Sequence, residues 1–196
     1  LRAGWIWDDD DYVTQNPLLP AANGLWRIWT EPRSLPQYYP LVHTGFWLEY
    51  RLFGLEPAGY HAVNVLLHAL SACLFWRVLR HLELPGAFFA AAVFAVHPVH
   101  VESVAWITER KNVQSLALAL AALLAWLAWW PLEEDRPAGR RRAWVLSFTL
   151  FAGALLSKTV ACSLPAVVLL LVWWKRGGIT RRHALATAPF FALGLA

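Results

Sequence analysis

The chain has 196 residues, of which 58% are hydrophobic and only 15% are charged, and its mean hydropathy is +0.41. This composition is too apolar for an ordinary water-soluble domain and is typical of a protein that crosses a membrane several times. The net charge of +4 is less informative than its distribution along the chain, and nothing indicates nucleic-acid binding. Because the chain starts on Leu1 and contains no Met, we expect a fragment of a longer protein.

Residues 1–58 are predicted to form the first outer loop. This region is rich in aromatic residues, is interrupted by prolines and has no apolar run long enough to cross a bilayer. The stretch 41–53 has an apolar and a polar side, which predicts a short helix lying at the membrane interface. A second short helix is expected over 24–29, with Asn23 as its N-cap.

Four consecutive acids, Asp8 to Asp11, lie within this loop in the segment WDDDDY. Carboxylates this close raise one another's proton affinity, so at least one of them is suited to act as a base or to bind a cation. The alternative is a solvated acidic loop. Trp5 and Trp7 come just before the acids and are residues of the kind that anchors a chain at a lipid headgroup layer.

Residues 59–196 are predicted to contain about six transmembrane segments, the last of them truncated. Pro98 follows the second apolar run and should break or kink its helix, because proline removes a backbone hydrogen bond. The expected segments cover 60–79, 85 to the polar burst at 97–112, 113–130, 143–156, 160–174 and the residues from about 183 onward.

Polar side chains form a stripe along the first of these segments. The spacing of His61, Asn64, His68 and Ser71 is three, four and three residues, which places all four on one helix face turned away from lipid. Polar groups at bilayer depth usually face a bundle interior or a wet cavity, which suggests the lining of a functional pocket. Hydrogen bonding between helices, for packing alone, is the other interpretation.

The basic residues predict the orientation of the bundle. Ten of the 17 Lys and Arg residues, and only four of the 13 acids, lie in the three loops 77–84, 131–142 and 175–183. Short loops rich in Lys and Arg face the cytoplasm. The acidic loop, the turn at 97–112 and Lys158 are therefore expected to share the outer face.

Acids, imidazoles and bases should thus meet on that face. An acid can take the proton of a hydroxyl acceptor, while Arg and Lys neutralise a phosphate leaving group, so the set suits group transfer from a phosphate-linked donor. The expected members are Asp8 to Asp11, Glu102, Glu109, His97, His100, His61, His68, Arg110, Lys111 and Lys158. A divalent-metal site at His97, His100 and Glu102, a solvated turn at 109–111 and a Lys158 that snorkels to the interface are the alternatives.

Several motifs in order resemble the membrane half of the transmembrane and tetratricopeptide-repeat-containing O-mannosyltransferases and their bacterial relatives. The motifs are WDDDDYVTQNP (7–17), YYPLVHTGFWLEYRLFGLEPAGYHAVNVLLH (38–68), HPVHVESVAWITERKN (97–112) and SKTVACSLP (157–165). The resemblance implies a GT-C glycosyltransferase fold similar to that of the protein O-mannosyltransferases. It places the family's catalytic acidic pair on Asp8 and Asp9 and the donor-phosphate contacts on Arg110 and Lys111. His97, His100 and Glu102 then line the pocket.

We therefore predict an all-α integral membrane protein, a multi-span GT-C-like bundle whose outer loop carries short interfacial helices. The predicted function is transfer of mannose or a similar hexose from a polyprenyl-phosphate donor to a protein or other acceptor. Lys158 is added to the phosphate contacts, and His61, Asn64 and His68 to the pocket lining. The bacterial relatives imply the inner membrane, with the active site on the periplasmic face. No cofactor is assigned from the sequence, and a divalent cation is left open. A transporter, or a membrane anchor for a repeat domain, is the alternative.

Overall fold

The computed structural model describes residues 4–132, 134 and 136–195, and within these ranges the chain is helical and has no strands. The all-α prediction is therefore confirmed. The α-helices are α1 (Gly24–Thr30), α2 (Pro40–Phe53), α3 (Pro57–His81), α4 (Ala87–Val96), α5 (Val101–Ala105), α6 (Arg110–Trp129), α7 (Arg141–Leu155), α8 (Leu164–Arg176) and α9 (Arg181–Gly194). Short helical turns are η1 (Asp10–Thr14), η2 (Pro32–Ser34), η3 (Pro98–His100), η4 (Ile107–Glu109) and η5 (Thr159–Ser163).

Three helical stretches are long and apolar enough to cross a membrane: Pro57–His81, Ile107–Trp129 and Thr159–Arg176. A fourth crossing results if α4 and the bent segment Pro98–Ala105 are counted as one span. Helices α7 and α9 have 15 and 14 residues, which is short for a complete crossing at 1.5 Å per residue. The predicted total of about six spans stays a prediction.

The proline-dependent break in the second span is confirmed. Helix α4 ends at Val96, and His97 adopts an extended backbone (φ −68°, ψ 129°), the conformation favoured for a residue before proline. The helical pair on either side of this break is bent by 49°. As a result, the residues after Pro98 leave the axis of α4.

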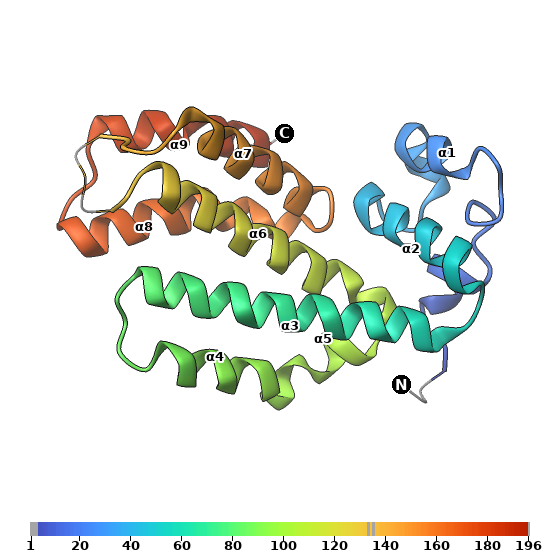
Figure 1. Ribbon diagram of the computed structural model, residues 1–196. Coiled ribbons are helices and arrows are strands. Elements are labelled where there is room, and N and C mark those ends of the chain that lie inside the picture. The colour runs from blue at the N-terminus through green and yellow to red at the C-terminus, as the bar shows by residue number, and fades with distance from the viewer. Residues whose placement is uncertain (1–3, 133, 135, 196) are drawn as a thin grey trace.

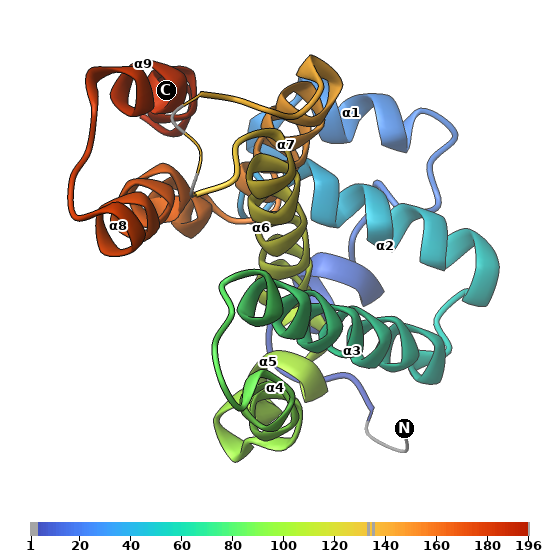
Figure 2. The ribbon, with the colours of Figure 1, turned by 60° about the vertical axis from the view of Figure 1, so that its left-hand side comes forward.

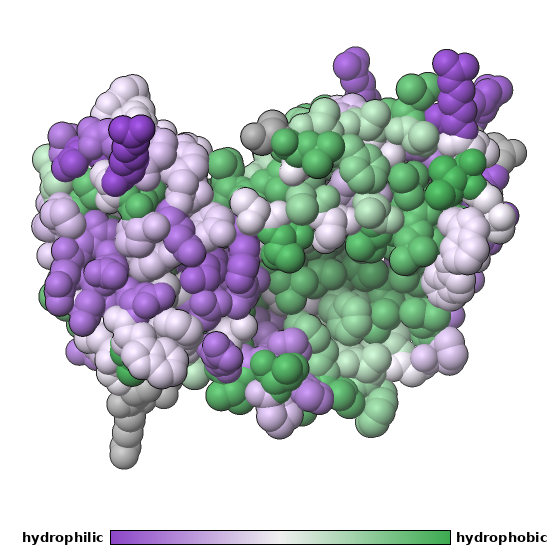
Figure 3. All heavy atoms as spheres, turned by 180° about the vertical axis from the view of Figure 1, so that it is seen from behind, coloured by the Kyte–Doolittle hydropathy of each residue, from purple (hydrophilic) through white to green (hydrophobic). Residues whose placement is uncertain are grey.

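The loops separate into two groups at opposite ends of the bundle (Figure 1). The three arginine-rich loops lie together at one end, where Lys175 Nζ donates to the carbonyl oxygen of Leu82 at 2.7 Å and the rings of Trp130 and His183 are 4.4 Å apart. Residues 4–56, η4 and the turn after α7 lie at the other end, which we call the acid-bearing end. The surface of the bundle between them is mainly hydrophobic, whereas the acid-bearing end is mainly hydrophilic (Figure 3).

Separate hydrophobic cores lie in the apolar bundle and at its acid-bearing end. Helices α6 and α7 occupy the middle of the bundle, with α3 and α4 on one side and α8 and α9 on another (Figure 2). Their core includes Trp126, Phe151 and Phe190. A second core at the acid-bearing end packs Tyr12 and Phe46 against Tyr60 at the start of α3. The second core joins the first loop to the bundle.

The first loop contains both predicted short helices, but two details of the prediction were wrong. Asn23 precedes α1 without a side-chain capping hydrogen bond. On α2, His43 and Glu49 were assigned to the polar side of an interfacial helix, yet both are buried, while Leu48 and Leu52 are exposed. His43 and Glu49 thus face the protein interior, Arg51 on the same helix is exposed, and apolar residues cover part of the outer side of α2.

The arrangement of the loops predicts which residues share a side of the membrane. In full-length protein lacking Cys73 and Cys162, a membrane-impermeant maleimide should label Ser163→Cys and Arg33→Cys from one side and Gly178→Cys from the other, because η5 and η2 lie opposite the α8–α9 turn. Labelling in intact and permeabilised membranes measures this. Equal access to Ser163→Cys and Gly178→Cys from one side would contradict the fold.

Candidate active site

The chain leaves the helical path between α5 and α6, and this break organises the acid-bearing end. Trp106 has an extended backbone (φ −84°, ψ 119°), so carbonyl groups near it lose their helical partners. The Nδ2 group of Asn64, from α3, lies 3.3, 3.1 and 3.5 Å from the carbonyl oxygens of Val104, Trp106 and Ile107. The predicted polar stripe therefore does turn inward, and its Asn64 supplies a hydrogen-bond donor to the carbonyl groups that lack helical partners at this break.

Asp9 supplies a hydrogen-bond acceptor to the backbone on the other side of the same break. Its buried carboxylate accepts hydrogen bonds from the backbone N–H of Thr108 at 2.9 Å, from the Thr108 hydroxyl and from the backbone N–H of Ile6 at 3.0 Å. Asp9 thus fastens the first loop to η4. Asp8, next to it, is exposed to solvent. The two acids of the predicted pair occupy different surroundings, one structural and one accessible.

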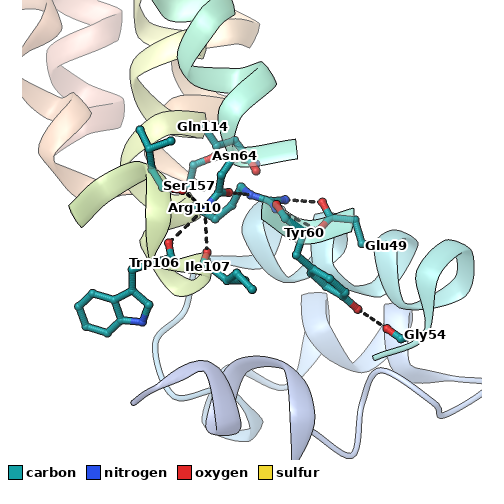
Figure 4. A network of polar contacts seen from close by, with 10 residues as sticks. Glu49, Gly54, Tyr60, Asn64, Trp106, Ile107, Arg110, Gln114 and Ser157 are labelled. Carbon is teal, nitrogen blue, oxygen red and sulfur yellow. Dashed lines mark hydrogen bonds and ion pairs between the residues drawn. The ribbon is translucent and has the colours of Figure 1, made fainter. Parts of the chain in front are cut away.

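Arg110, the first residue of α6, is almost completely buried in a polar network (Figure 4). Its guanidinium forms a two-pronged ion pair with Glu49 of α2, and Nη2 also donates to the carbonyl oxygen of Tyr60 at 3.0 Å. Nε donates to Oδ1 of Asn64. Burial raises the pKa of Glu49, and Arg110 opposes that shift by hydrogen bonding and charge. The network joins α2, α3 and α6.

The two lysines predicted to hold phosphate share one carboxylate. Nζ of Lys111 lies 3.0 Å from one oxygen of Glu109, and Nζ of Lys158 lies 4.0 Å from the other. Lys158 also donates to Oδ1 of Asn112, whose Nδ2 donates to Glu109 and, at 3.0 Å, to Oγ of Ser103. Two cations around one anion leave an excess of positive charge. Lys158 is the more accessible of the two lysines.

Tyr12 connects this lysine group with the acidic loop. Nζ of Lys111 lies 5.6 Å from the centre of the Tyr12 ring, and the Tyr12 hydroxyl donates to Oε1 of Gln37 at 2.8 Å. Burial raises the pKa of Tyr12, and the charges of Asp8, Glu109 and Asp11 raise it further. The backbone N–H of Tyr12 also donates to the carbonyl oxygen of Asp8 at 3.1 Å, so Tyr12 lies between the accessible acid and Lys111.

His43 of α2 stacks on Tyr12, with ring centres 5.0 Å apart and ring planes at 15°. The imidazole is fully buried, and within the part of the chain that the structure describes neither ring nitrogen has a partner in hydrogen-bonding geometry. Burial lowers the pKa of His43 to about 4, and the backbone of Gln37 offsets only part of this effect. His43 is therefore neutral at physiological pH.

The predicted pocket-lining imidazoles form a separate group. His68, His97 and His100 line a cavity of about 220 Å³ beside the α4–α5 break. Its described lining residues include neither the acids nor the lysines of the group around Glu109. Nε2 of His68 lies 3.1 Å from the carbonyl oxygen of Ala95, and Nδ1 of His97 accepts from the backbone N–H of Val99. His61 is buried, and Glu102 is exposed.

No group of three or more His, Cys, Asp or Glu side chains in the described part of the chain is arranged to hold a metal ion. The divalent cation that was left open, including a site at His97, His100 and Glu102, has no such ligand set there.

Sequence reasoning did not single out several residues that build this site, among them Glu49, Tyr12, His43 and Thr108. Glu49 is one acid among the apolar residues of 41–53, and that surplus of apolar neighbours was the available signal for its burial. Thr108 gave no signal, because only the fold brings it to Asp9.

The buried network predicts that loss of the Arg110–Glu49 ion pair lowers the free energy of unfolding much more than loss of the partly exposed Arg27–Glu31 pair. Arg110→Leu should lower the free energy of unfolding by about 3–5 kcal/mol, because it leaves Glu49 buried without its cation. Arg27→Leu is the matched control: its pair with Glu31 is partly exposed, so its removal should cost less than about 1 kcal/mol. Thermal unfolding of the full-length protein in detergent measures both. Equal stability of the two variants would show that the Arg110 network is not a structural lock.

The burial of His43 predicts that the folded protein loses stability as the pH falls. Its pKa lies below the ordinary 6.5, so the unfolded chain binds more protons between about pH 6.5 and 4, and stability present above this window is lost as the pH falls through it. The loss should be on the order of 3 kcal/mol. His43→Leu should flatten the dependence of the melting temperature on pH in this window. An unchanged slope would contradict the burial of a neutral imidazole.

A family model described as dolichyl-phosphate-mannose-protein mannosyltransferase matches residues 37–196. The protein O-mannosyl-transferase TMTC2 of Mus musculus is 32% identical over 191 residues, which cover 92% of this chain and 21% of that protein. Tmtc1 of Drosophila melanogaster is 35% identical over 173 residues, covering 82% of this chain and 19% of that protein. For Tmtc3 of the same species the identity is 33% over 188 residues, covering 80% and 20%.

No solved structure is significantly similar to this chain. The chain spans about a fifth of the length of the curated relatives it matches. The matched region nevertheless includes most of this chain and, in TMTC2, nearly all of it. The resemblance found in the sequence motifs is confirmed: the chain belongs to the family of the dolichyl-phosphate-mannose-protein mannosyltransferases and protein O-mannosyl-transferases.

Proposed function

We propose that the protein containing this chain transfers mannose, or a similar hexose, from a polyprenyl-phosphate donor to a hydroxyl group of a protein or glycan acceptor. The names of the relatives support the sugar and the transferase class. The observation that carries the proposal is that Tyr12 lies between an accessible acid, Asp8, and the lysine pair around Glu109, at one end of an apolar bundle. This end is where a lipid-linked donor and a water-soluble acceptor can meet.

In this proposal Asp8 is the general base. The acceptor hydroxyl oxygen attacks the anomeric carbon as its proton passes to the Asp8 carboxylate, and the bond from that carbon to the phosphate oxygen breaks. The electron pair of the broken bond leaves on the polyprenyl phosphate, and the configuration at the anomeric carbon inverts. Positioned acids of this kind contribute about 10²–10⁴-fold to rate. Asp9 is a positioning residue, since its three hydrogen bonds fix the backbone next to Asp8.

The phosphate is assigned to Lys158, with Lys111 adding charge from behind Glu109. Lys158 has the more accessible ammonium group, and the positive excess around Glu109 can stabilise charge developing on a leaving phosphate. Arg110 was expected to contact the phosphate as well. We assign it the role of holding α2, α3 and α6 together, because its guanidinium is directed at Glu49, Tyr60 and Asn64.

The proposal places this site on the side of the membrane opposite the arginine-rich loops. The support is the charge bias of those loops together with their position at the other end of the bundle. For a bacterial protein this corresponds to the periplasmic face of the inner membrane. The transporter alternative gains no specific support, because Asn64 and His68 are already engaged with backbone carbonyl groups.

The different surroundings of the two acids predict different kinetic defects in the full-length enzyme. Asp8→Asn should lower kcat by about 10²-fold or more, with little change in KM for the lipid donor and none in melting temperature, because it removes only the proton acceptor. Asp9→Asn should lower the melting temperature and raise KM as well, since an amide cannot accept from both Ile6 and Thr108. Steady-state kinetics with a polyprenyl-phosphate mannose donor, together with thermal unfolding, measure these effects.

Asp11→Asn is the control for Asp8→Asn, because it removes an exposed neighbouring charge without removing the proposed base. It should retain most of the turnover. Normal turnover of Asp8→Asn would refute the assignment of the base, and equal losses in Asp8→Asn and Asp11→Asn would reduce the acidic cluster to a general electrostatic effect.

A further inference from the structure

Trp7, immediately before Asp8, combines two costly features. Its backbone has a positive φ of 47°, in the left-handed region that bulky residues rarely adopt, and its side chain is 74% exposed. Strain of this kind costs about 1–3 kcal/mol and persists only where surrounding contacts enforce it. It also concentrates at binding and catalytic sites.

The contacts of Asp9 enforce this conformation. The backbone N–H of Asp9 donates to the carbonyl oxygen of Ile6 at 3.0 Å, while the Asp9 carboxylate accepts from the N–H of Ile6 in return. Trp7 and Asp8 lie at the tip of the turn that these two hydrogen bonds close. Because the same carboxylate is fastened to Thr108, the tip has a fixed position over η4.

A second tryptophan fixes the orientation of the exposed indole. The rings of Trp7 and Trp106 meet edge to face, with centres 5.0 Å apart and planes at 76°. Trp106 lies in the break between α5 and α6, directly before η4. Its indole N–H is buried and has no hydrogen-bond acceptor among the described residues. An exposed ring is thus supported from one side, next to this buried donor.

We propose that the Trp7 indole is the platform on which the transferred hexose stacks, and this rests on the proposed function. The C–H groups on one face of a pyranose ring are weakly positive and apolar, and they pack on the negative face of an aromatic ring. A sugar on Trp7 lies next to Asp8, where the acceptor hydroxyl must lose its proton. Trp7 thereby selects a pyranose over a smaller or acyclic group.

The alternative occupant is the lipid headgroup layer, which the sequence suggested for Trp5 and Trp7. Trp5 instead packs edge to face on Tyr60, with ring centres 5.0 Å apart, at the margin of the second core. An interfacial anchor requires neither a strained backbone nor a ring held by a second indole, because a tryptophan on a relaxed backbone also partitions into the headgroup region. Trp7 has both features, which favours a ligand of defined shape.

Binding of two soluble probes to the full-length protein separates the platform from the phosphate site. Mannose 1-phosphate carries both the sugar and the phosphate, whereas inorganic phosphate carries only the latter. Trp7→Leu keeps an apolar side chain and the same backbone requirement but lacks an aromatic face. It should weaken binding of mannose 1-phosphate by about fivefold or more and leave phosphate binding unchanged, and Trp7→Phe should restore most of the loss.

Trp26→Leu is the matched control, since Trp26 is 71% exposed on α1 of the same loop. It should change neither affinity, while Lys158→Gln should weaken both. Isothermal titration calorimetry measures the dissociation constants. Equal binding of mannose 1-phosphate by wild type and Trp7→Leu would overturn the platform and leave the proposed function standing. The same conclusion would follow if Trp7→Leu lost only its binding to anionic lipid vesicles. Failure of the wild type to bind either probe would instead overturn the proposed function.

Discussion

The buried ion pair between Arg110 and Glu49 is the interaction on which the acid-bearing end depends. Removing two charges from water is expensive, and their attraction repays this only when the remaining donors and acceptors are also satisfied. Here Asn64 and the Tyr60 carbonyl complete the set. The partners come from three helices, so the network forms only when all three are in place. The pair therefore specifies one arrangement of α2, α3 and α6 more than it adds net stability.

This arrangement makes a deliberate break in the chain tolerable. The extended backbone at Trp106 removes hydrogen bonds that a continuous helix would have made, and unpaired backbone groups are costly when buried. Asn64 from α3 and Asp9 from the first loop supply the missing partners. The same hydrogen bonds that repair the backbone carry Asp8 and Trp7 to the tip of a fixed turn. The hydrogen bonds that satisfy the backbone at this break are therefore the ones that also position Asp8 and Trp7.

Sequence reasoning predicted the parts of this structure that depend on local patterns. Helix periodicity placed the stripe containing Asn64 toward the interior, and the chemistry of Pro98 predicted the bend. The grouping of charged loops at one end also followed from composition. The spacing of residues did not reveal that Glu49 and His43 are buried, because these two polar residues of α2 face the protein interior instead of water. Nothing local distinguishes a salt-bridged Arg110 from a phosphate-binding one.

The same limit applies to the two adjacent acids, which are identical in sequence terms and different in the fold. The Asp9 carboxylate accepts hydrogen bonds from three donors, so it has little capacity left to accept a proton from a substrate hydroxyl. Asp8 gains its accessibility because Asp9 is held. The lysine group repeats this division, since Glu109 holds both ammonium groups while balancing only one of their charges. In the proposed site, the ion pairs with Glu109 hold both lysines and still leave a net positive charge around that carboxylate.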